Sequence, residues 1–401
     1  MKELQKISDS NELLQAYKMA SNGSDWKTSV QKYEANLLKN IRKTREDLRN
    51  NTYKQGEFLE FELNERGHNR RIKALGIADR VVQRSICDNV MIPDLTKYLV
   101  YDNGASQKKK GVDFCRRRLE THLHRYYRKY GNDGYMLHID FRKFFDNIRH
   151  DKLVEALQGK IDPDVLMILE QMIYSFKVDI SYSDEDLLNK VFNSLEYAKL
   201  PQQCKTGKRY MAKSMGIGSQ ISQVAGVFFP TRIDNYCKIV RGCKYYGRYM
   251  DDIYIIHNDK EFLRDVLRGI RVEADKIGLF INEKKTQIYK LSHGFSFLKI
   301  KYNLTSTGKI IKRPSRDNIT RQRRKMKKFK RLVDTGQMTM KDARNEVRSW
   351  LGSMKKINAY KTSQNIRKLY KDLFGVDVYD TPSQDEPKRV NTLIQLSKKV
   401  K

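Results

Sequence analysis

The sequence predicts an α+β fold built from two or three structural modules. Helical periodicity dominates residues 1–60 and returns after Gly308. Between these regions lie short runs rich in Tyr, Ile and Phe, which are typical of strands. A chain of 401 residues is long enough for several such modules.

The composition points to a polyanionic partner. The chain has 80 Lys and Arg against 48 Asp and Glu, a formal net charge of +32, and the basic residues are spread along its length. Such a distribution fits a protein that follows nucleic acid over a long path. No apolar run of ~20 residues and no lipidation motif is present, so no membrane partner is expected.

The N-terminal sequence and the cysteines predict a cytoplasmic protein. Residues 1–14 lack the apolar core of a signal peptide. The five cysteines are an odd number without CxxC spacing, which favours reduced, packed thiols over disulfides or a zinc site.

The first 100 residues are expected to contain helices interrupted by one strand pair. Two strands are expected within 53–75 around a turn at 64–69, with Arg71 and Lys73 on one face of the second strand. Two cations on one face suit a triphosphate, and a plain exposed strand fits equally well. A helix follows over 79–99, and Pro93 marks its end or the start of another.

A basic loop at 104–111 and a strongly basic helix at 112–129 come next. Their charge exceeds what a solvated helix needs and favours contact with a nucleic-acid backbone. The residues expected to make this contact are Lys108, Lys109, Lys110, Arg116 and Arg117.

Three carboxylates carry the main functional signal. Residues 244–257 predict two buried strands joined by a tight turn with Asp251 and Asp252, and the strand at 135–139 delivers Asp140 at its end. Uncompensated carboxylates at the edge of a core are costly, and a hard divalent cation removes that cost. Taken alone, the Asp pair fits a polar β-turn as well. With Asp140 it predicts a site for two cations ~3.5–4 Å apart, as used in nucleotidyl transfer.

Two further segments are expected near these carboxylates. Phe145 would lie beside the sugar of an incoming nucleotide and exclude a 2′-hydroxyl, although a core aromatic is the plainer interpretation. Residues 215–223 form a Gly-rich turn before an apolar helix at 224–239, and Gly218 lets the backbone approach a substrate closely.

After the Asp pair, the pattern predicts a helix at 260–277 and strands at 279–286 and 295–302. Lys285 is placed to protonate or screen a pyrophosphate leaving group, or else is simply solvated.

Past Gly308 a helical module follows a Pro-containing linker at Pro314, and eight of the eleven residues 321–331 are basic. Those expected to contact nucleic acid are Arg321, Arg324 and Lys328.

The chain resembles reverse transcriptases from about Lys27 to Phe374. TyrMetAspAsp at 249–252 matches the YxDD motif, and Asp140 in DFRKFFDNI matches the first catalytic aspartate, with Phe145 at the steric-gate position. The segments DRVVQ (79–83), LFINEKKT (279–286) and FLK (297–299) follow in the family's order.

This resemblance implies a right-hand polymerase with fingers, a ferredoxin-like palm and a helical thumb. The expected boundaries are 1–132 for N-terminal helices and fingers, 133–307 for the palm with a finger insertion at about 153–214, 308–380 for the thumb, and 381–401 for a tail. It also implies two Mg²⁺ ions, or Mn²⁺ in their place, with template RNA, a DNA or RNA primer and dNTPs as partners. Metal ligands would be Asp140, Phe141, Asp251 and Asp252, and the dNTP site would include Arg71, Lys73, Phe145, Ile217, Gly218, Gln220 and Lys285.

The loop Ile217-Gly218-Ser219-Gln220-Ile221-Ser222-Gln223 replaces the QGxxxSP pattern of most lineages and resembles the bacterial and phage diversity-generating retroelement enzymes. These copy a template RNA with frequent errors at adenines and work with a small basic accessory protein. An antiviral-defence enzyme that copies a non-coding RNA is the main alternative. A group II intron-like enzyme and, from a different class, a non-catalytic RNA-binding protein on a polymerase scaffold also stay open.

Overall fold

The computed structural model describes residues 3–65, 68–180 and 210–380, which fall into two compact units. The first unit combines Met1–His122 with Tyr135–Ile288, and the second combines Leu123–Gly134 with Tyr289–Lys401. Residues 181–209 of the expected finger insertion and the expected tail at 381–401 lie outside the described residues.

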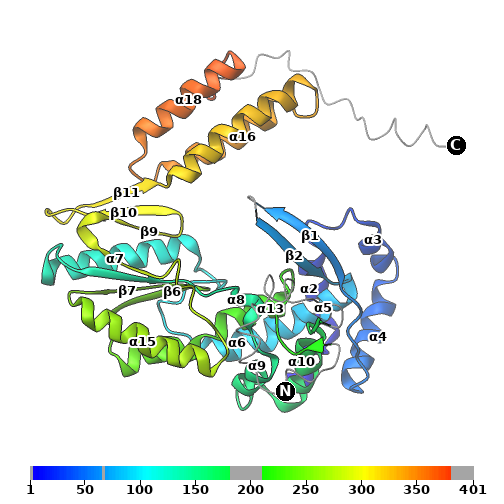
Figure 1. Cartoon of the computed structure of the whole chain (residues 1–401). Helices are drawn as coiled ribbons and strands as arrows, with labels where there is room; N and C mark the ends of the chain where they lie inside the picture. The colour runs from blue at the N-terminus through cyan, green and yellow to red at the C-terminus, as the bar shows by residue number, and fades with distance from the viewer. Residues whose placement is uncertain (1–2, 66–67, 181–209, 381–401) are drawn as a thin grey trace. The chain divides into compact units, whose positions relative to one another are not determined.

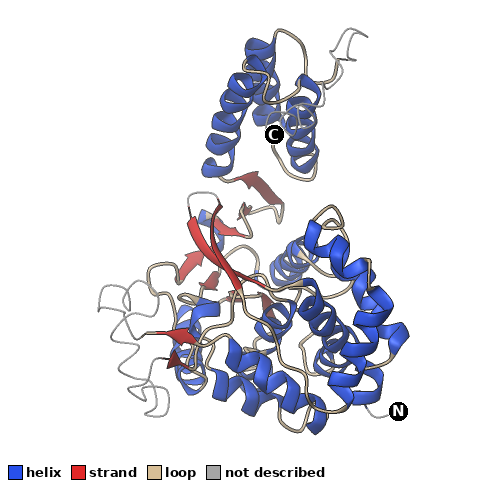
Figure 2. Cartoon of the chain, turned by 90° about the vertical axis from the view of Figure 1, so that its right-hand side faces the viewer, coloured by secondary structure: helices blue, strands red, loops and turns tan. Residues whose placement is uncertain are grey.

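Helices form most of the first 100 residues, as expected (Figure 1), and they are the main element of the described chain (Figure 2). Their bounds are Glu3–Ile7 (α1), Ser10–Ser21 (α2), Thr28–Glu34 (α3), Leu37–Arg49 (α4), Ile77–Ile86 (α5), the π-helical turn Cys87–Met91 (η1) and Ile92–Thr96 (α6). Leu13 and Tyr17 of α2 pack with Val81 of α5 in a common core. Pro93 lies in the first turn of α6, directly after the π-helical turn η1.

The expected strand pair is an antiparallel hairpin of β1 (Leu59–Glu65) and β2 (His68–Ala74). Glu60 pairs with Lys73 and Glu62 with Arg71 in its register. One face is therefore lined with charged residues, as the alternation of the sequence predicts.

The central sheet of the first unit has the strand order β6-β7-β3-β8. The strands are Tyr245–Tyr249 (β6), Asp252–His257 (β7), Tyr135–Ile139 (β3) and Gln287–Lys290 (β8). Helices α7 (Val112–Tyr130) and α15 (Lys260–Lys276) lie on either side of it (Figure 1). Residues 253–256 of β7 are all buried, which explains their unbroken apolar run.

The first unit also contains helices and two-residue strands outside the central sheet. They are Phe144–Asn147 (α8), His150–Leu157 (α9), Pro163–Ser175 (α10), Val178–Asp179 (β4), Tyr210–Met211 (β5), Gln220–Phe228 (α13), Thr231–Asn235 (α14) and the π-helical turn Tyr236–Val240 (η3). The single helix expected at 224–239 is wrong, because the structure has a helix with other bounds, α13, followed by α14 and η3. Helix α13 begins at Gln220, because the Ser219 hydroxyl caps it, and it ends at Phe228, before Pro230.

The strand expected at 279–286 is also wrong. Only Ile281 forms a bridge, to Phe141, and the chain then turns. The turn forms because the Asn282 carbonyl accepts from the N–H groups of Lys285 and Thr286, at 3.1 and 2.9 Å. The strand itself begins one residue later, as β8.

In the second unit, the single strand expected at 295–302 is a hairpin. Leu298 and Lys299, both with positive φ, form the turn between β9 and β10. Pro314 is the last residue of β11 and not part of a linker. The elements here are Leu291–His293 (η4), Phe295–Phe297 (β9), Ile300–Leu304 (β10), Ile310–Pro314 (β11), Arg316–Asp334 (α16), Met340–Met354 (α17) and Tyr360–Phe374 (α18). Their helical core includes Met326, Val347, Ile366 and Tyr370.

Candidate active site

Three aspartates from distant parts of the sequence meet at one end of the central sheet. Strand β3 pairs with β7 through Ile139 and Ile253, so the register continued by one residue sets Asp140 opposite Asp252. Directly opposed residues of antiparallel strands have Cα atoms about 4.5–5.5 Å apart. Asp251 is the second central residue of the β6–β7 turn and immediately precedes Asp252.

The electrostatics of Asp251 reflect this proximity. Burial raises the pKa of its carboxyl to about 6, and repulsion from Asp252 and Asp140 adds to the rise, while Lys285 opposes it. A carboxyl pKa raised by burial and by like charges indicates that several carboxylates lie close together and repel one another. Such a place can stabilise a positively charged ligand.

Neighbouring side chains contact two of the three aspartates, Asp140 and Asp252. Asp140 accepts from the Asn282 amide at 2.9 Å and from the Lys285 ammonium at 3.3 Å. Asp252 lies 3.3 Å from the His138 ring. Within the described ranges, no three His, Cys, Asp or Glu side chains already have the spacing of a metal site. Lys285, predicted beside the leaving group, is here an ion-pair partner of Asp140.

The turn that carries Asp251 is conformationally strained. Met250, its first central residue, has φ of 55°, a position that two-residue hairpin turns usually give to Gly. A non-glycine residue held there costs about 1–3 kcal/mol and persists only where its surroundings enforce it. The Arg248 guanidinium supplies one such restraint, since its Nη1 donates to the Met250 carbonyl at 3.0 Å.

Phe141 and Phe145 flank the end of β3 in different environments. Phe141 is buried, and its backbone bridges to Ile281. Phe145 is half-buried and packs edge-on against Phe144, with ring centroids 5.2 Å apart. A Cβ on Gly226 would lie 2.9 Å from the Phe145 ring, so glycine at this position leaves room for the ring.

The loop around Ile217 is joined to β2 by backbone pairing. The Lys73 N–H donates to the Ile217 carbonyl at 3.0 Å, and Ile72 and Ile217 form a parallel bridge. Gly218, with φ of 114°, packs so closely here that a Cβ would lie 3.1 Å from the Ile72 side chain. The Ile217 side chain stays 37% exposed, and the Gln220 amide donates to Asp88 at 3.2 Å.

The two cations predicted for the triphosphate have intramolecular partners. Arg71 pairs with Glu60, and the Lys73 ammonium lies 3.5 Å from the same carboxylate. Lys73 also donates to the Phe176 carbonyl at 3.2 Å, and burial lowers the pKa of its ammonium. Only 11% of its side chain is exposed, so it is held within the protein in this state.

Residues 64–303 match the family model described as reverse transcriptase (RNA-dependent DNA polymerase). This span is more than half of the chain, and it includes Asp140, Asp251 and Asp252. The chain belongs to the reverse transcriptase family. The description of this family is that of an RNA-dependent DNA polymerase, the class of nucleotidyltransferase that the resemblance implies.

Solved structures similar to this reverse transcriptase include two yeast telomerases. One is telomerase from Candida albicans in complex with a TWJ fragment of telomeric RNA, with 10% identity and a TM-score of 0.47. The other is apo telomerase from Candida tropicalis, with 12% identity and a TM-score of 0.48. Each alignment covers 80% of this chain, which spans 60% and 62% of the two telomerase chains respectively. No curated protein matches the sequence.

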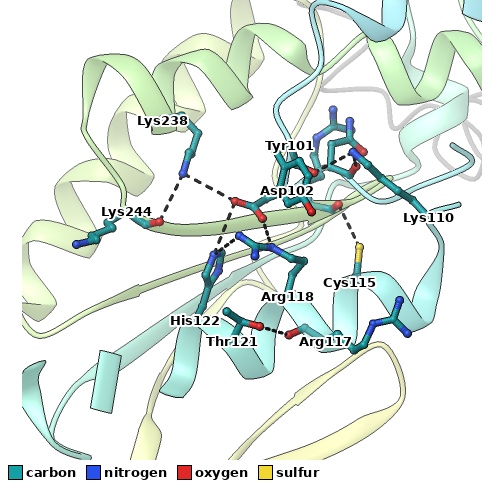
Figure 3. A network of polar contacts seen from close by, with 12 residues as sticks. Tyr101, Asp102, Lys110, Cys115, Arg117, Arg118, Thr121, His122, Lys238 and Lys244 are labelled. Atoms are coloured by element: carbon teal, nitrogen blue, oxygen red, sulfur yellow. Dashed lines mark hydrogen bonds and ion pairs between the residues drawn. The ribbon is translucent and has the colours of Figure 1, made fainter. Parts of the chain in front are cut away.

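The basic loop of the reverse transcriptase divides into exposed and inward-facing lysines. Lys108 and Lys109 are exposed, whereas Lys110 donates to the carbonyls of Tyr101 and Asn103, at 2.9 and 3.1 Å (Figure 3). In α7, Arg117 is exposed and Arg116 lies 3.6 Å from Asp113. Lys110 therefore fastens its loop to the 101–103 segment.

Helix α16 presents the predicted cations on one exposed face. Arg321, Arg324 and Lys328 follow at helical spacing and are exposed, while Met326 and Phe329 are buried. The helix turns its apolar side toward the core of its own unit.

The sequence reasoning missed the residues that hold the aspartates in place. Asn282 lies within a motif that was recognised, yet its contact with Asp140 joins positions 142 apart. The fully buried pair of Arg248 and Asp234 was missed as well. One signal was available: an arginine in an otherwise apolar strand requires a buried partner.

Proposed function

We propose that this reverse transcriptase synthesises cDNA by two-metal nucleotidyl transfer at Asp140, Asp251 and Asp252. The observation that carries the proposal is the meeting of three aspartates at one end of the central sheet, where the strand register sets Asp140 opposite Asp252 and Asp251 directly precedes Asp252. The ligands would be the carboxylate oxygens of the three aspartates and the backbone carbonyl of Phe141, and oxygen donors of this kind fit Mg²⁺ or Mn²⁺. Two such ions, when bound, activate the attacking oxygen and stabilise the leaving one.

The protein side chains would bind and orient the nucleotide. Phe145 would lie against the sugar, with Ile217, Gly218 and Gln220 beside it. Arg71, Lys73 and Lys285 would turn from their present carboxylate partners toward the phosphates, whose oxygens also accept charge-assisted bonds. Lys285 would then screen the pyrophosphate rather than Asp140.

The proposed domains follow the family's hand-like arrangement. Residues 1–132 would form the N-terminal helices and fingers, 133–307 the palm with its insertion at about 153–214, 308–380 the thumb, and 381–401 a tail. Template RNA and a DNA or RNA primer would contact Lys108, Lys109, Arg116 and Arg117, together with the exposed face of α16. None of the helices in the described residues has the length and apolar character needed to span a bilayer.

Phe145→Val is expected to admit ribonucleotides. The smaller side chain leaves space for a 2′-hydroxyl, and discrimination in an apolar pocket changes by about tenfold or more per lost group of this size. Single-nucleotide incorporation with dNTP and rNTP measures the ratio. Phe144→Leu is the control, because it alters the neighbouring buried ring and should lower thermal stability without changing sugar choice. An unchanged ratio in Phe145→Val would remove the gate assignment.

We propose further that the enzyme is of the diversity-generating type, with a small basic accessory protein as partner. Its support is the exposed Ile217 side chain, which offers no hydrogen bond to a nucleotide sugar. Without a bond of ~1 kcal/mol that rewards correct geometry, selection relaxes several-fold.

Ile217→Gln is therefore expected to lower the error rate several-fold, most of all opposite adenines. The variant should fold normally, because residue 217 is held in place through its backbone carbonyl. Sequencing of cDNA made on a defined RNA template measures the errors, and Ile217→Leu is the matched apolar control. Equal error spectra for all three proteins would contradict the role given to this loop.

A further inference from the structure

A fully buried ion pair lies directly behind the turn that carries Asp251 and Asp252. The Arg248 guanidinium donates to both oxygens of Asp234, from Nε at 2.7 Å and from Nη2 at 2.6 Å, and both side chains are 0% exposed. The Tyr246 hydroxyl donates to the same carboxylate. A buried ion pair is a weak source of stability compared with apolar packing, so stability alone does not explain this one.

The remaining donors of Arg248 connect this pair to the active site. Nη1 donates to the carbonyl of Met250, the residue that precedes Asp251, at 3.0 Å. Nη2 donates to the carbonyl of Val227 in α13 at 2.9 Å. A single planar group thus joins α14, α13 and the turn. The flexible, single-centred ammonium of a lysine cannot reproduce this fork.

The backbone of Arg248 is held from the opposite direction. Its N–H donates to the Asp102 carbonyl, and its carbonyl accepts from the Gly104 N–H, both at 3.0 Å. The Asp102 carboxylate in turn accepts from Arg118 and lies 3.7 Å from His122, both on α7 (Figure 3). With its backbone fixed in this way, the guanidinium has a defined place from which to hold the turn.

We propose that Arg248 is a positioning residue for nucleotidyl transfer, which fixes the Met250 carbonyl and thereby the directions of Asp251 and Asp252. It acts on the two carboxylates through the turn, by way of the Met250 carbonyl. The inference rests on the proposed function of the two aspartates. It predicts that loss of the fork reduces the rate of the chemical step more than it reduces binding or stability.

Arg248→Lys is the first test, because lysine keeps the charge beside Asp234 but loses the fork. We expect kcat for primer extension to fall by about 10²-fold, the cost of a misplacement of about 1 Å at a reacting centre. KM for dNTP, RNA affinity and the melting temperature should change little. Arg241→Lys is the control, since Arg241 pairs with Asp265 on the surface. A kcat above half of the wild-type value in Arg248→Lys would overturn the proposal.

A double variant separates positioning from stability. Arg248→Met alone leaves Asp234 buried and unpaired and should lower the melting temperature strongly. Adding Asp234→Leu removes the second charge and should restore much of the melting temperature but not kcat. Joint recovery of both quantities would show that the pair is merely structural. If the double variant does not fold, Arg248→Lys decides the question.

Asp251→Asn in the same assay distinguishes this inference from the proposed function. If Asp251→Asn remains active, the proposed function fails and the inference fails with it. If Asp251→Asn is inactive and Arg248→Lys is fully active, only the inference fails.

Discussion

Replacement of Asp251 by asparagine is expected to abolish DNA synthesis while leaving RNA affinity nearly unchanged. The amide keeps the shape of the side chain but removes one of the charges that would hold a divalent cation. Charge stabilisation by bound metal contributes several kcal/mol to such reactions, so we expect a loss of at least about 10³-fold in rate. Extension of a primer on an RNA template, with Mg²⁺ and again with Mn²⁺, measures the loss.

The same substitution should not destabilise the protein. Burial and two acidic neighbours raise the pKa of Asp251 to about 6, above its ordinary value of 3.8. A carboxyl whose pKa is raised on folding costs the folded state stability once it is ionised, near neutral pH and above. Its neutral replacement should therefore keep or raise the melting temperature at pH 7.5.

Asp275→Asn is the matched control, because it makes the same chemical change at an exposed position of α15. It should behave as wild type in extension, RNA binding and thermal unfolding. Extension by Asp251→Asn at more than a tenth of the wild-type rate would refute the metal-binding role. If Asp251→Asn lost RNA affinity as strongly as it lost extension activity, the substitution would instead disturb the fold around the site.

The elements that the sequence predicts well are those with a local cause. The hairpin with Asp251 and Asp252 is recognisable because both strands are rich in Tyr or Ile and because β7 is buried on both faces and has a continuous apolar run at 253–256. The N-terminal helices and α16 show the periodicity of one buried face. In each case the pattern that predicts the element lies within a few consecutive residues of the sequence.

The errors occur where a distant contact overrides the local pattern. Residues 279–286 have the composition of a strand, but Asn282 turns the chain while its side chain contacts Asp140. The turn at Leu298 and Lys299 carries no Gly or Asn signal, so the hairpin of β9 and β10 reads as one strand. A single sequence does not contain the tertiary packing that stabilises either conformation.

The candidate site shows the same division. Asp140, Asp251 and Asp252 stand out as carboxylates at strand ends, and their chemistry suggests that they meet. The partners that hold them, Asn282 and Arg248, have no such signature. Asn282 becomes visible only through its hydrogen bond to Asp140. The arginine in strand β6 indicates a buried partner, but its contact with the Met250 carbonyl is visible only in the fold.

Template binding is expected to weaken steeply with salt. If about six phosphates are contacted, RNA affinity should fall by ~10³-fold or more between 50 and 200 mM salt, because bound counterions are released on association. The net charge of +32 and the exposed cations of α16 support this magnitude. Fluorescence anisotropy of a labelled primer–template across this range measures the slope of log affinity against log salt.

Helix α16 offers a charge-matched pair of variants for this experiment. Arg324 and Lys328 are exposed, whereas Lys325 and Lys330 pair with Glu346 and Asp334. Arg324→Gln with Lys328→Gln should reduce the slope by about 1.4–1.8, since each phosphate contact contributes about 0.7–0.9. Lys325→Gln with Lys330→Gln removes the same net charge but should change the slope much less. Equal slopes for both double variants would mean that only the overall charge matters, and a flat response of the wild type would contradict contact with the phosphate backbone altogether.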